Sequence, residues 1–213
     1  AFLQISEIVG EEHIGWRYDP IFIDDKYTVK YHLEQFEGIS AALQGYTKNC
    51  VISFLDLYQK VKRNFPEVKM VSKEQRKYLG QRMTRIATEH KMILRPCGEG
   101  TELAAFGADC NGCMTQQIYE NAIHMSLDMP KKQSLRKECA CYLGNDIGAY
   151  NSCPHMCKYC YANYDEKSVR LNRINHNPKS AFLIGDDMPN DKVHKAVQKS
   201  WINGQISLNG FFI

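Results

Sequence analysis

The run Cys50-Val51-Ile52-Ser53-Phe54-Leu55 is short and almost continuously apolar. Such a run is typical of a strand in a parallel sheet, because helices cover both faces of that kind of sheet. The segment from Asp56 to about Asn64 follows it and predicts a helix. The stretch therefore indicates an α/β fold in which it forms a buried strand.

Two more strands are predicted, at His13–Pro20 and at Met92–Leu94. One helix should end before Gly45, and another should begin after Ser72, which can form a capping box with Gln75. Three strands that are each separated by a helix imply right-handed βαβ units and a parallel sheet. The apolar positions that mark the helices are Leu33, Phe36, Ile39 and Leu43 in the first and Leu79, Met83 and Ile86 in the second.

The pattern is less regular outside these units. A helix is predicted from Phe2 to Ile8, stopped at Gly10, so the chain is expected to begin partway through a domain. We expect residues 1–100 to hold the βα units and residues 101–213 to form a cysteine-rich region packed on the same domain. The elements predicted in this second region are helices at 114–125, 165–173 and 191–201 and a short strand at 181–184.

The composition narrows the classes of function. The 213 residues include 27 basic and 24 acidic ones, and the net charge of +3 is too even to indicate nucleic-acid binding by itself. No apolar run approaches the ~20 residues of a membrane span, so we expect no membrane partner. Nine cysteines, with no secretory signal before them, indicate metal binding in a reducing compartment and hence the cytoplasm.

Three of the cysteines lie in one short loop. Cys153, Cys157 and Cys160 form a Cys-x-x-x-Cys-x-x-Cys pattern, with Tyr159 before the last thiol. Three thiolates spaced in this way can bind three irons of a four-iron, four-sulfur ([4Fe-4S]) cluster and leave the fourth iron open for a reactive ligand. Zinc ribbons normally present Cys-x-x-Cys pairs, which this spacing fits poorly, but zinc remains an alternative.

Six further cysteines lie outside this loop. Cys50 belongs to the buried strand and is interpreted as a core residue. Four others could form a second four-thiolate site for a second [4Fe-4S] cluster or for zinc, and the alternative is that they carry no metal. Cys113 would be a fifth thiol for four positions, so we interpret it as a bystander. The four candidate ligands are Cys97, Cys110, Cys139 and Cys141.

Polar side chains follow each predicted strand. Because the carboxyl ends of parallel strands meet at one edge of a sheet, ligands usually bind there. Arg17 and Asp19 are the candidates to face a cofactor or substrate. The alternatives are that Asp19-Pro20 is a turn and that Asp56 caps a helix. The residues expected at this edge are Arg17, Tyr18, Asp19, Ser53, Asp56, Cys97 and Glu99.

With these residues placed, the chain resembles a bacterial family, domain of unknown function 1848. The C-terminal cysteine cluster of that family is similar to the cluster of radical S-adenosylmethionine enzymes. The likeness covers nearly the whole chain. The matching stretches here are Trp16–Ile21, Gly45–Tyr58 and Asp146–Asn163.

The resemblance implies part of a TIM-like barrel with a cysteine-rich C-terminal extension, and an additional N-terminal region that this chain lacks. It also implies a radical S-adenosylmethionine-type enzyme that generates a 5′-deoxyadenosyl radical on an unknown substrate, with an electron donor such as flavodoxin or ferredoxin. Tyr159 would lie by the adenine, and Glu99 would stand in for the residues that hold the methionine amine. Two features depart from such enzymes: the cluster loop follows the last strands, and Gly98-Glu99-Gly100 follows a different strand.

A second interpretation is a scaffold or nucleic-acid-binding module that holds zinc or a closed cluster and performs no radical chemistry. Basic and aromatic side chains alternate beside the cysteine loop and could bind nucleic acid, although such a stretch is more often a solvated helix face. The two interpretations predict different metals. The side chains concerned are Lys158, Lys167, Arg170, Arg173 and Lys179, with Tyr161 and Tyr164.

Overall fold

The computed structural model describes residues 1–130, 139, 141–142, 148–192, 194–195, 197 and 199–204. The chain divides into two compact units. The first, here called the sheet unit, comprises the described residues of Ala1–Leu55, Val71–Leu143 and Lys199–Ile213. The second, the loop unit, comprises those of Asp56–Met70 and Gly144–Gln198. Each unit therefore combines segments from before and after residue 100.

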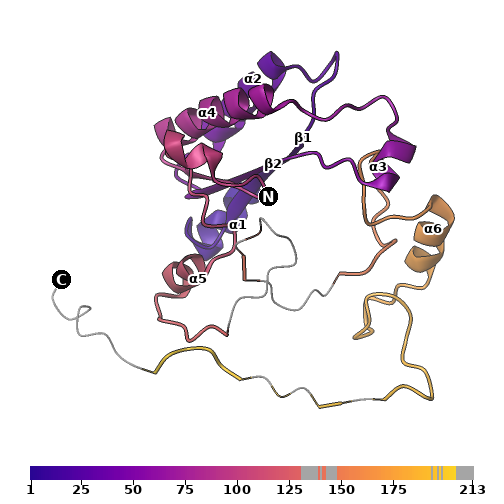
Figure 1. Cartoon of the computed structure of the whole chain (residues 1–213). Coiled ribbons are helices and arrows are strands. Elements are labelled where there is room, and N and C mark those ends of the chain that lie inside the picture. Colours follow the sequence, from indigo (N-terminus) through magenta and orange to yellow (C-terminus); the bar gives the residue numbers. More distant parts are fainter. Residues whose placement is uncertain are drawn as a thin grey trace. The chain divides into compact units, whose positions relative to one another are not determined.

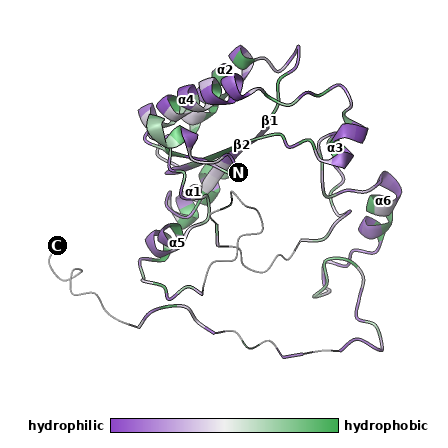
Figure 2. Cartoon of the chain, in the orientation of Figure 1, coloured by the Kyte–Doolittle hydropathy of each residue, from purple (hydrophilic) through white to green (hydrophobic). Residues whose placement is uncertain are grey.

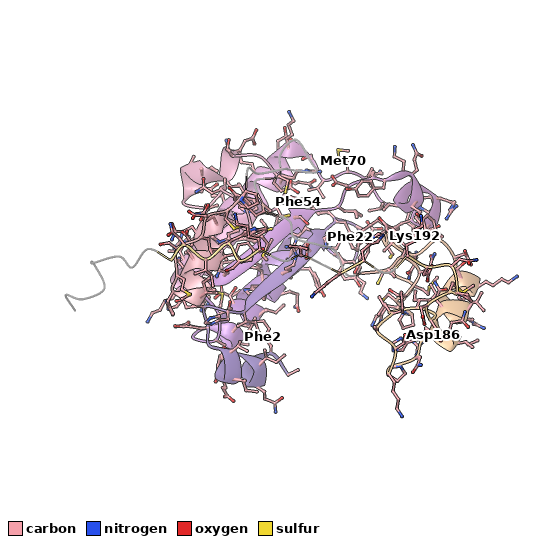
Figure 3. All side chains as sticks on the ribbon, turned by 90° about the horizontal axis from the view of Figure 1, so that it is seen from below. Phe2, Phe22, Phe54, Met70, Asp186 and Lys192 are labelled. Atoms are coloured by element: carbon pink, nitrogen blue, oxygen red, sulfur yellow. The ribbon has the colours of Figure 1, made fainter. Side chains whose placement is uncertain are left out.

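The sheet unit is built on three parallel strands, β1 (Gly15–Ile21), β2 (Asn49–Phe54) and β3 (Ile93–Pro96), in the order β1-β2-β3. Cys50 of the central strand lies opposite Trp16 of β1 and Leu94 of β3. The strands finish at one edge of the sheet, where Phe54 ends β2 and Phe22 follows β1 (Figure 3). The α/β prediction is confirmed, and the three strands form a small open sheet.

Helices α2 (Val29–Leu43) and α4 (Lys73–Glu89) lie side by side on one face of this sheet (Figure 1). Ser72 and Gln75 form the predicted capping box at the start of α4. Polar and apolar segments alternate along both helices (Figure 2), as expected where one helix face packs on a sheet. The other helices of this unit are α1 (Phe2–Val9) and α5 (Gln116–Ile123), which confirm two predicted helices, and the 3-10 helix η1 (Glu102–Phe106).

The hydrophobic core joins the sheet to these two helices. Ile52 of β2 and Leu79 and Met83 of α4 have no exposed surface. The Trp16 indole donates a hydrogen bond from Nε1 to Sδ of Met92, at 3.3 Å. The positions predicted as the apolar face of α4 are therefore core residues, and this packing holds the strands in place.

The loop unit contains α3 (Gln59–Asn64) and α6 (Glu166–Ile174). Helix α6 confirms the predicted polar helix, and the Asp165 carboxylate caps it by accepting a hydrogen bond from Ser168 N at 2.7 Å. Helix α3 has Tyr58 at its N-cap, so the alternative reading of Asp56 as a cap is wrong. In the described part of the chain, no helix is both long and apolar enough to cross a membrane.

Two predicted elements near the C-terminus are wrong. The described residues of 181–184 form no strand, and those of 191–201 form no helix. Leu183 is 46% exposed and Val197 is 95% exposed, so these apolar side chains have no buried face to stabilise regular structure. The segment that follows belongs to the sheet unit. Within that unit, Ile202 and Leu127 form an isolated antiparallel bridge.

Gly80 of α4 marks a close approach to η1. A Cβ added at this position would lie 2.5 Å from both Cδ atoms of the buried Leu103. The substitution Gly80→Ala is expected to lower the free energy of unfolding by about 1–3 kcal/mol, because the core must shift to admit the methyl group. Urea denaturation followed by circular dichroism measures the change.

Gly38→Ala in α2 is the matched control. No atom lies within 4 Å of a Cβ added at Gly38. Alanine is the better helix former, so this substitution should raise the free energy of unfolding by up to ~1 kcal/mol. Two equal effects of the same sign would contradict the packing described here.

Candidate functional site

The cysteine loop (Asn151–Asn163) lies in the loop unit and contains Cys153, Cys157 and Cys160. Cys153 and Cys157 are exposed, and Cys160 is half-buried. A backbone hydrogen bond of 2.9 Å from Cys160 N to Cys157 O closes the turn between the last two thiols. The loop therefore presents its sulfurs at the surface on a backbone that is locally hydrogen-bonded.

Asn163 ties the two ends of this loop together. Its Nδ2 donates a hydrogen bond to Cys153 O at 2.6 Å, and its backbone N–H donates to Sγ of Cys160 at 3.4 Å. The side chain is 5% exposed, and its Oδ1 is buried with no hydrogen-bond partner among the described residues. Asn163 thus fixes the first cysteine relative to the third, and it places an N–H donor on a candidate ligand sulfur.

A cavity of about 360 Å³ opens beside two of the three cysteines. Its volume falls within the range of small-molecule sites, ~300–1,000 Å³. The wall includes thiols, a cationic side chain and an aromatic ring, so it offers donors as well as an apolar surface. Among the residues that line it are Cys157, Lys158, Cys160, Asn163, Tyr164 and Asp165.

Tyr164 forms the aromatic part of this wall. The Tyr150 ring stacks on it with centroids 5.7 Å apart and planes inclined by 26°. The Lys60 ammonium lies 4.4 Å from the Tyr164 ring centroid, a cation–π contact. Tyr159, which the family resemblance would place by the adenine, is half-buried. Tyr164 rather than Tyr159 lines the cavity. Sequence analysis singled out Tyr164 only as part of a basic and aromatic surface.

The cysteine loop offers three thiols as donors. Among the described residues, no group of three or more His, Cys, Asp or Glu side chains is arranged to hold one ion. In a four-iron cluster each thiolate binds a different iron of one shared core. Cys160 accepts an N–H to Sγ hydrogen bond, a type of contact that tunes the potential of iron-sulfur clusters in proteins that hold one.

A separate group of sulfurs lies in the sheet unit, after the end of β3. Sγ of Cys113 is 3.8 Å from Sγ of Cys97 and 3.3 Å from Sγ of Cys141. We call Cys97, Cys113 and Cys141 the thiol trio. Sequence analysis grouped Cys97 and Cys141 but interpreted Cys113 as a bystander, whereas the structure places Cys113 between them.

The other two predicted ligands lie differently. The Cys110 thiol is directed to its own loop, with Sγ 3.9 Å from Ala108 O, and the residue packs against the hydrophobic core. Cys139 is half-buried. The signal for Cys113 was the Cys-x-x-Cys spacing of Cys110 and Cys113, but that spacing does not say which of the two thiols turns to the edge of the sheet.

Three of the side chains expected at the carboxyl edge do lie together. Arg17 forms an ion pair with Asp19 (Nη2 to Oδ2, 2.8 Å), and the Ser53 hydroxyl donates to the same carboxylate oxygen at 3.2 Å. Arg17 Nη1 also lies 3.8 Å from Sγ of Cys113. The shared edge therefore connects the Arg17–Asp19 pair to the thiol trio, as the parallel strand order predicts.

These contacts shift the thiol pKa values of the trio in opposite directions. The Cys113 thiol donates a hydrogen bond to Cys97, and this bond, with help from the Arg17 guanidinium, outweighs burial and lowers the pKa of Cys97 to about 5. The same bond, burial and the contact with Cys141 raise the pKa of the Cys113 thiol well above its usual range. These opposite shifts make Cys97, rather than Cys113, the thiol of this pair that loses its proton more readily.

Glu99 makes structural contacts inside the sheet unit. Its Oε1 accepts a hydrogen bond from Phe54 N at 2.8 Å, and its Oε2 forms an ion pair with Arg76 Nη1 at 3.0 Å. The Glu99 side chain is 10% exposed. The carboxylate thus joins the end of β2 to helix α4, and both of its oxygens are engaged.

A family model described as Domain of unknown function (DUF1848) matches residues 1–162. The match covers more than half of the chain and includes the three strands, the thiol trio and all three cysteines of the loop. No curated protein matches, and no solved structure matches.

The structural contacts of Glu99 generate a prediction. Glu99→Ala should lower the free energy of unfolding by about 1–3 kcal/mol, because it leaves the Phe54 N–H and the Arg76 guanidinium without their acceptor. Chemical denaturation measures the loss. The matched control is Glu89→Ala in the exposed pair with Arg85, which should change the stability far less because solvent screens that pair. A Glu99→Ala protein as stable as the parent would exclude the structural assignment.

Proposed function

We propose that this chain, which belongs to the DUF1848 family, is an iron-sulfur enzyme of the radical S-adenosylmethionine type. In this proposal Cys153, Cys157 and Cys160 bind three irons of a [4Fe-4S] cluster, and the fourth iron is open to S-adenosylmethionine. One observation carries the proposal. The loop whose three thiols are closely spaced in the sequence borders a ligand-sized cavity on the side of Cys157 and Cys160.

When bound, such a cluster supplies one electron for reductive cleavage of a sulfonium, the chemistry that yields a 5′-deoxyadenosyl radical. The protein's own residues bind, orient and shield. The three thiolates hold the metal, and Asn163 keeps Cys153 and Cys160 at a fixed separation through its two hydrogen bonds. Its N–H to the Cys160 sulfur favours the thiolate form of that ligand.

The wall of the cavity suits a nucleoside. Tyr164 is held by Tyr150 and Lys60, so its ring is preorganised as an aromatic surface near the thiols. A purine could pack against this wall, and Tyr159, two residues after Cys157, remains the sequence-based candidate for the adenine. Arg17 and Asp19 belong to the sheet unit, and a role for them towards cofactor or substrate remains a prediction.

The remaining parts of the proposal come from chemistry and family resemblance. The open parallel sheet would be one arc of a TIM-like barrel. An electron donor such as flavodoxin or ferredoxin would reduce the cluster. The density of thiols favours a reducing compartment, and the cytoplasm is the location that we propose. The substrate is a molecule with a hydrogen that a carbon radical can abstract.

The zinc or nucleic-acid alternative draws on the same surface of the loop unit. The Lys60–Tyr164 contact is the observation in its favour, since stacked aromatic and basic groups bind bases. Two of the basic side chains proposed for that surface are already paired, Lys158 with Glu67 at 2.8 Å and Arg170 with Glu166 at 2.5 Å. We therefore favour the iron-sulfur enzyme.

Anaerobic reconstitution with iron and sulfide tests the proposal. The parent protein should gain iron, sulfide and broad visible absorption, and with dithionite it should convert S-adenosylmethionine to 5′-deoxyadenosine. Cys157→Ala should lose 5′-deoxyadenosine formation, because one iron loses its thiolate. Cys110→Ser is the control, because the Cys110 thiol is directed to the backbone of its own loop. This variant should retain 5′-deoxyadenosine formation.

The outcomes separate the two functions. A colourless protein that binds zinc at the loop would favour the scaffold or nucleic-acid module. Unchanged 5′-deoxyadenosine formation by Cys157→Ala would show that the three-thiol loop does not hold the catalytic cluster.

Asn163 provides a second, more local test. Asn163→Ala should leave all three thiols in place but weaken iron retention by about 10- to 100-fold, as substitutions in outer-shell partners of metal ligands do. Iron released to a chelator over time gives the measure. Asn177→Ala is the control, because that side chain accepts a hydrogen bond from Lys179 N outside the cysteine loop. Equal retention in both variants would remove Asn163 from the proposed site.

A further inference from the structure

The thiol trio forms a chain of sulfur contacts with Cys113 in the middle. Sγ of Cys113 is within 3.8 Å of Cys97 and 3.3 Å of Cys141, and all three residues belong to the sheet unit. The three cysteines come from separate positions: Cys97 follows β3, Cys113 lies in the next loop, and Cys141 comes 28 residues after Cys113. Tertiary contacts alone bring these sulfurs together.

The distance between the Cys113 and Cys141 sulfurs suits sulfur–sulfur chemistry better than a single ion, whereas the 3.8 Å between the Cys97 and Cys113 sulfurs is compatible with either. A tetrahedral zinc site with bonds of ~2.3 Å separates its sulfurs by about 3.8 Å, more than the 3.3 Å between Cys113 and Cys141. Within the described residues, the sulfurs of the trio do not constitute a group that holds a metal ion. A disulfide joins two neighbouring sulfurs, and Cys113 has a sulfur contact on each side.

Exposure and charge divide the roles among the three thiols. Cys97 and Cys113 are half-buried, whereas Cys141 is 3% exposed. The Arg17 guanidinium lies 3.8 Å from Sγ of Cys113, and its side chain is 45% exposed. The Arg17 cation also helps to lower the pKa of the neighbouring Cys97 thiol, and it therefore favours the nucleophilic thiolate form at Cys97. A small disulfide can thus reach Cys97 and Cys113, while Cys141 is shielded from solvent.

We propose that Cys97, Cys113 and Cys141 form a thiol–disulfide exchange site for small-molecule disulfides, in which Cys113 is the partner common to every disulfide formed. This site is distinct from the cysteine loop and does not depend on the function proposed for that loop. The geometry assigns the resting oxidised form to the closest pair, Cys113 and Cys141.

The exchange proceeds in balanced steps. The Cys97 thiolate attacks one sulfur of a disulfide RSSR, a Cys97–SR bond forms, and RS⁻ leaves and takes up a proton. Cys113 then attacks the Cys97 sulfur; the bond to SR breaks, and the proton of Cys113 leaves with the second RS⁻ as RSH. Two protein thiols have been oxidised, and RSSR has been reduced to two RSH.

A last exchange moves the disulfide inward. Cys141 attacks the Cys113 sulfur, the Cys97–Cys113 bond breaks, and the proton of Cys141 passes to Cys97. This step consumes no oxidant, because one disulfide replaces another. The product has its disulfide at the shorter of the two contacts and a free thiol at Cys97.

The experiment uses the full chain carrying Cys153→Ser, Cys157→Ser and Cys160→Ser, so that the loop thiols cannot contribute. The reduced protein is incubated with oxidised glutathione, its free thiols are alkylated, and its tryptic peptides are mapped by mass spectrometry. Trypsin cuts between Cys113 and Cys141, since Lys131 and Lys137 lie between them. The expected product is a peptide cross-linked through Cys113 and Cys141, with two fewer alkylated thiols.

Single substitutions in this background identify the shared sulfur. Cys113→Ser should abolish every disulfide within the trio. Cys141→Ser should leave a Cys97–Cys113 disulfide, and Cys97→Ser should leave the Cys113–Cys141 disulfide but form it more slowly. Cys110→Ser is the matched control, because Cys110 is three residues from Cys113 and faces the core, and it should change nothing.

Two results would overturn the proposal. One is a disulfide formed equally well through Cys110 or Cys139 when Cys113 is replaced. The other is a trio that resists oxidised glutathione and holds one zinc per chain that Cys113→Ser removes and Cys110→Ser does not, because the thiols would then be metal ligands.

Discussion

The burial of the central strand is the constraint on which the rest of the sheet unit depends. Cys50 and Ile52 of β2 have no exposed surface, so β2 requires a strand on each side and apolar cover. Strands β1 and β3 lie on the two sides of β2, and the apolar face of α4 contributes to its apolar cover. Because the three strands are parallel, their ends meet at one edge. This edge brings together Arg17, Ser53 and Cys97, which come from three separate parts of the chain.

The two groups of cysteines differ in the way that they are held. In the cysteine loop, short-range hydrogen bonds position exposed thiols, with Asn163 linking Cys153 to Cys160. In the thiol trio, the packing of the sheet unit brings Cys113 and Cys141 into contact. Local hydrogen bonds leave the loop thiols exposed beside a cavity, whereas packing in the sheet unit brings the sulfurs of the trio into contact with one another. These differences are why we assign metal chemistry to the first group and disulfide exchange to the second.

Glu99 shows that a residue at the ligand-binding edge of a sheet can also stabilise the fold. It follows β3 at the edge where ligands usually bind, which made it a candidate for cofactor binding. Its carboxylate instead accepts the backbone N–H of Phe54 and pairs with Arg76. The end of a parallel strand leaves backbone groups that need partners, and a buried carboxylate can meet that need as well as a ligand could. The edge thus contains structural and candidate functional groups side by side.

The sequence by itself determined the features whose signals are local. The capping box of Ser72 and Gln75, the apolar run of β2 and the spacing of the loop cysteines can all be read within a few residues, since hydrogen-bond geometry and strand burial act over that range. Only the tertiary structure decided which of Cys110 and Cys113 joins the trio. That choice depends on Cys97 and Cys141, which are distant in sequence, and on which side of the loop packs on the core. The wrong predictions at 181–184 and 191–201 have the same cause, because apolar residues form regular structure only when the fold offers them a surface on which to bury it.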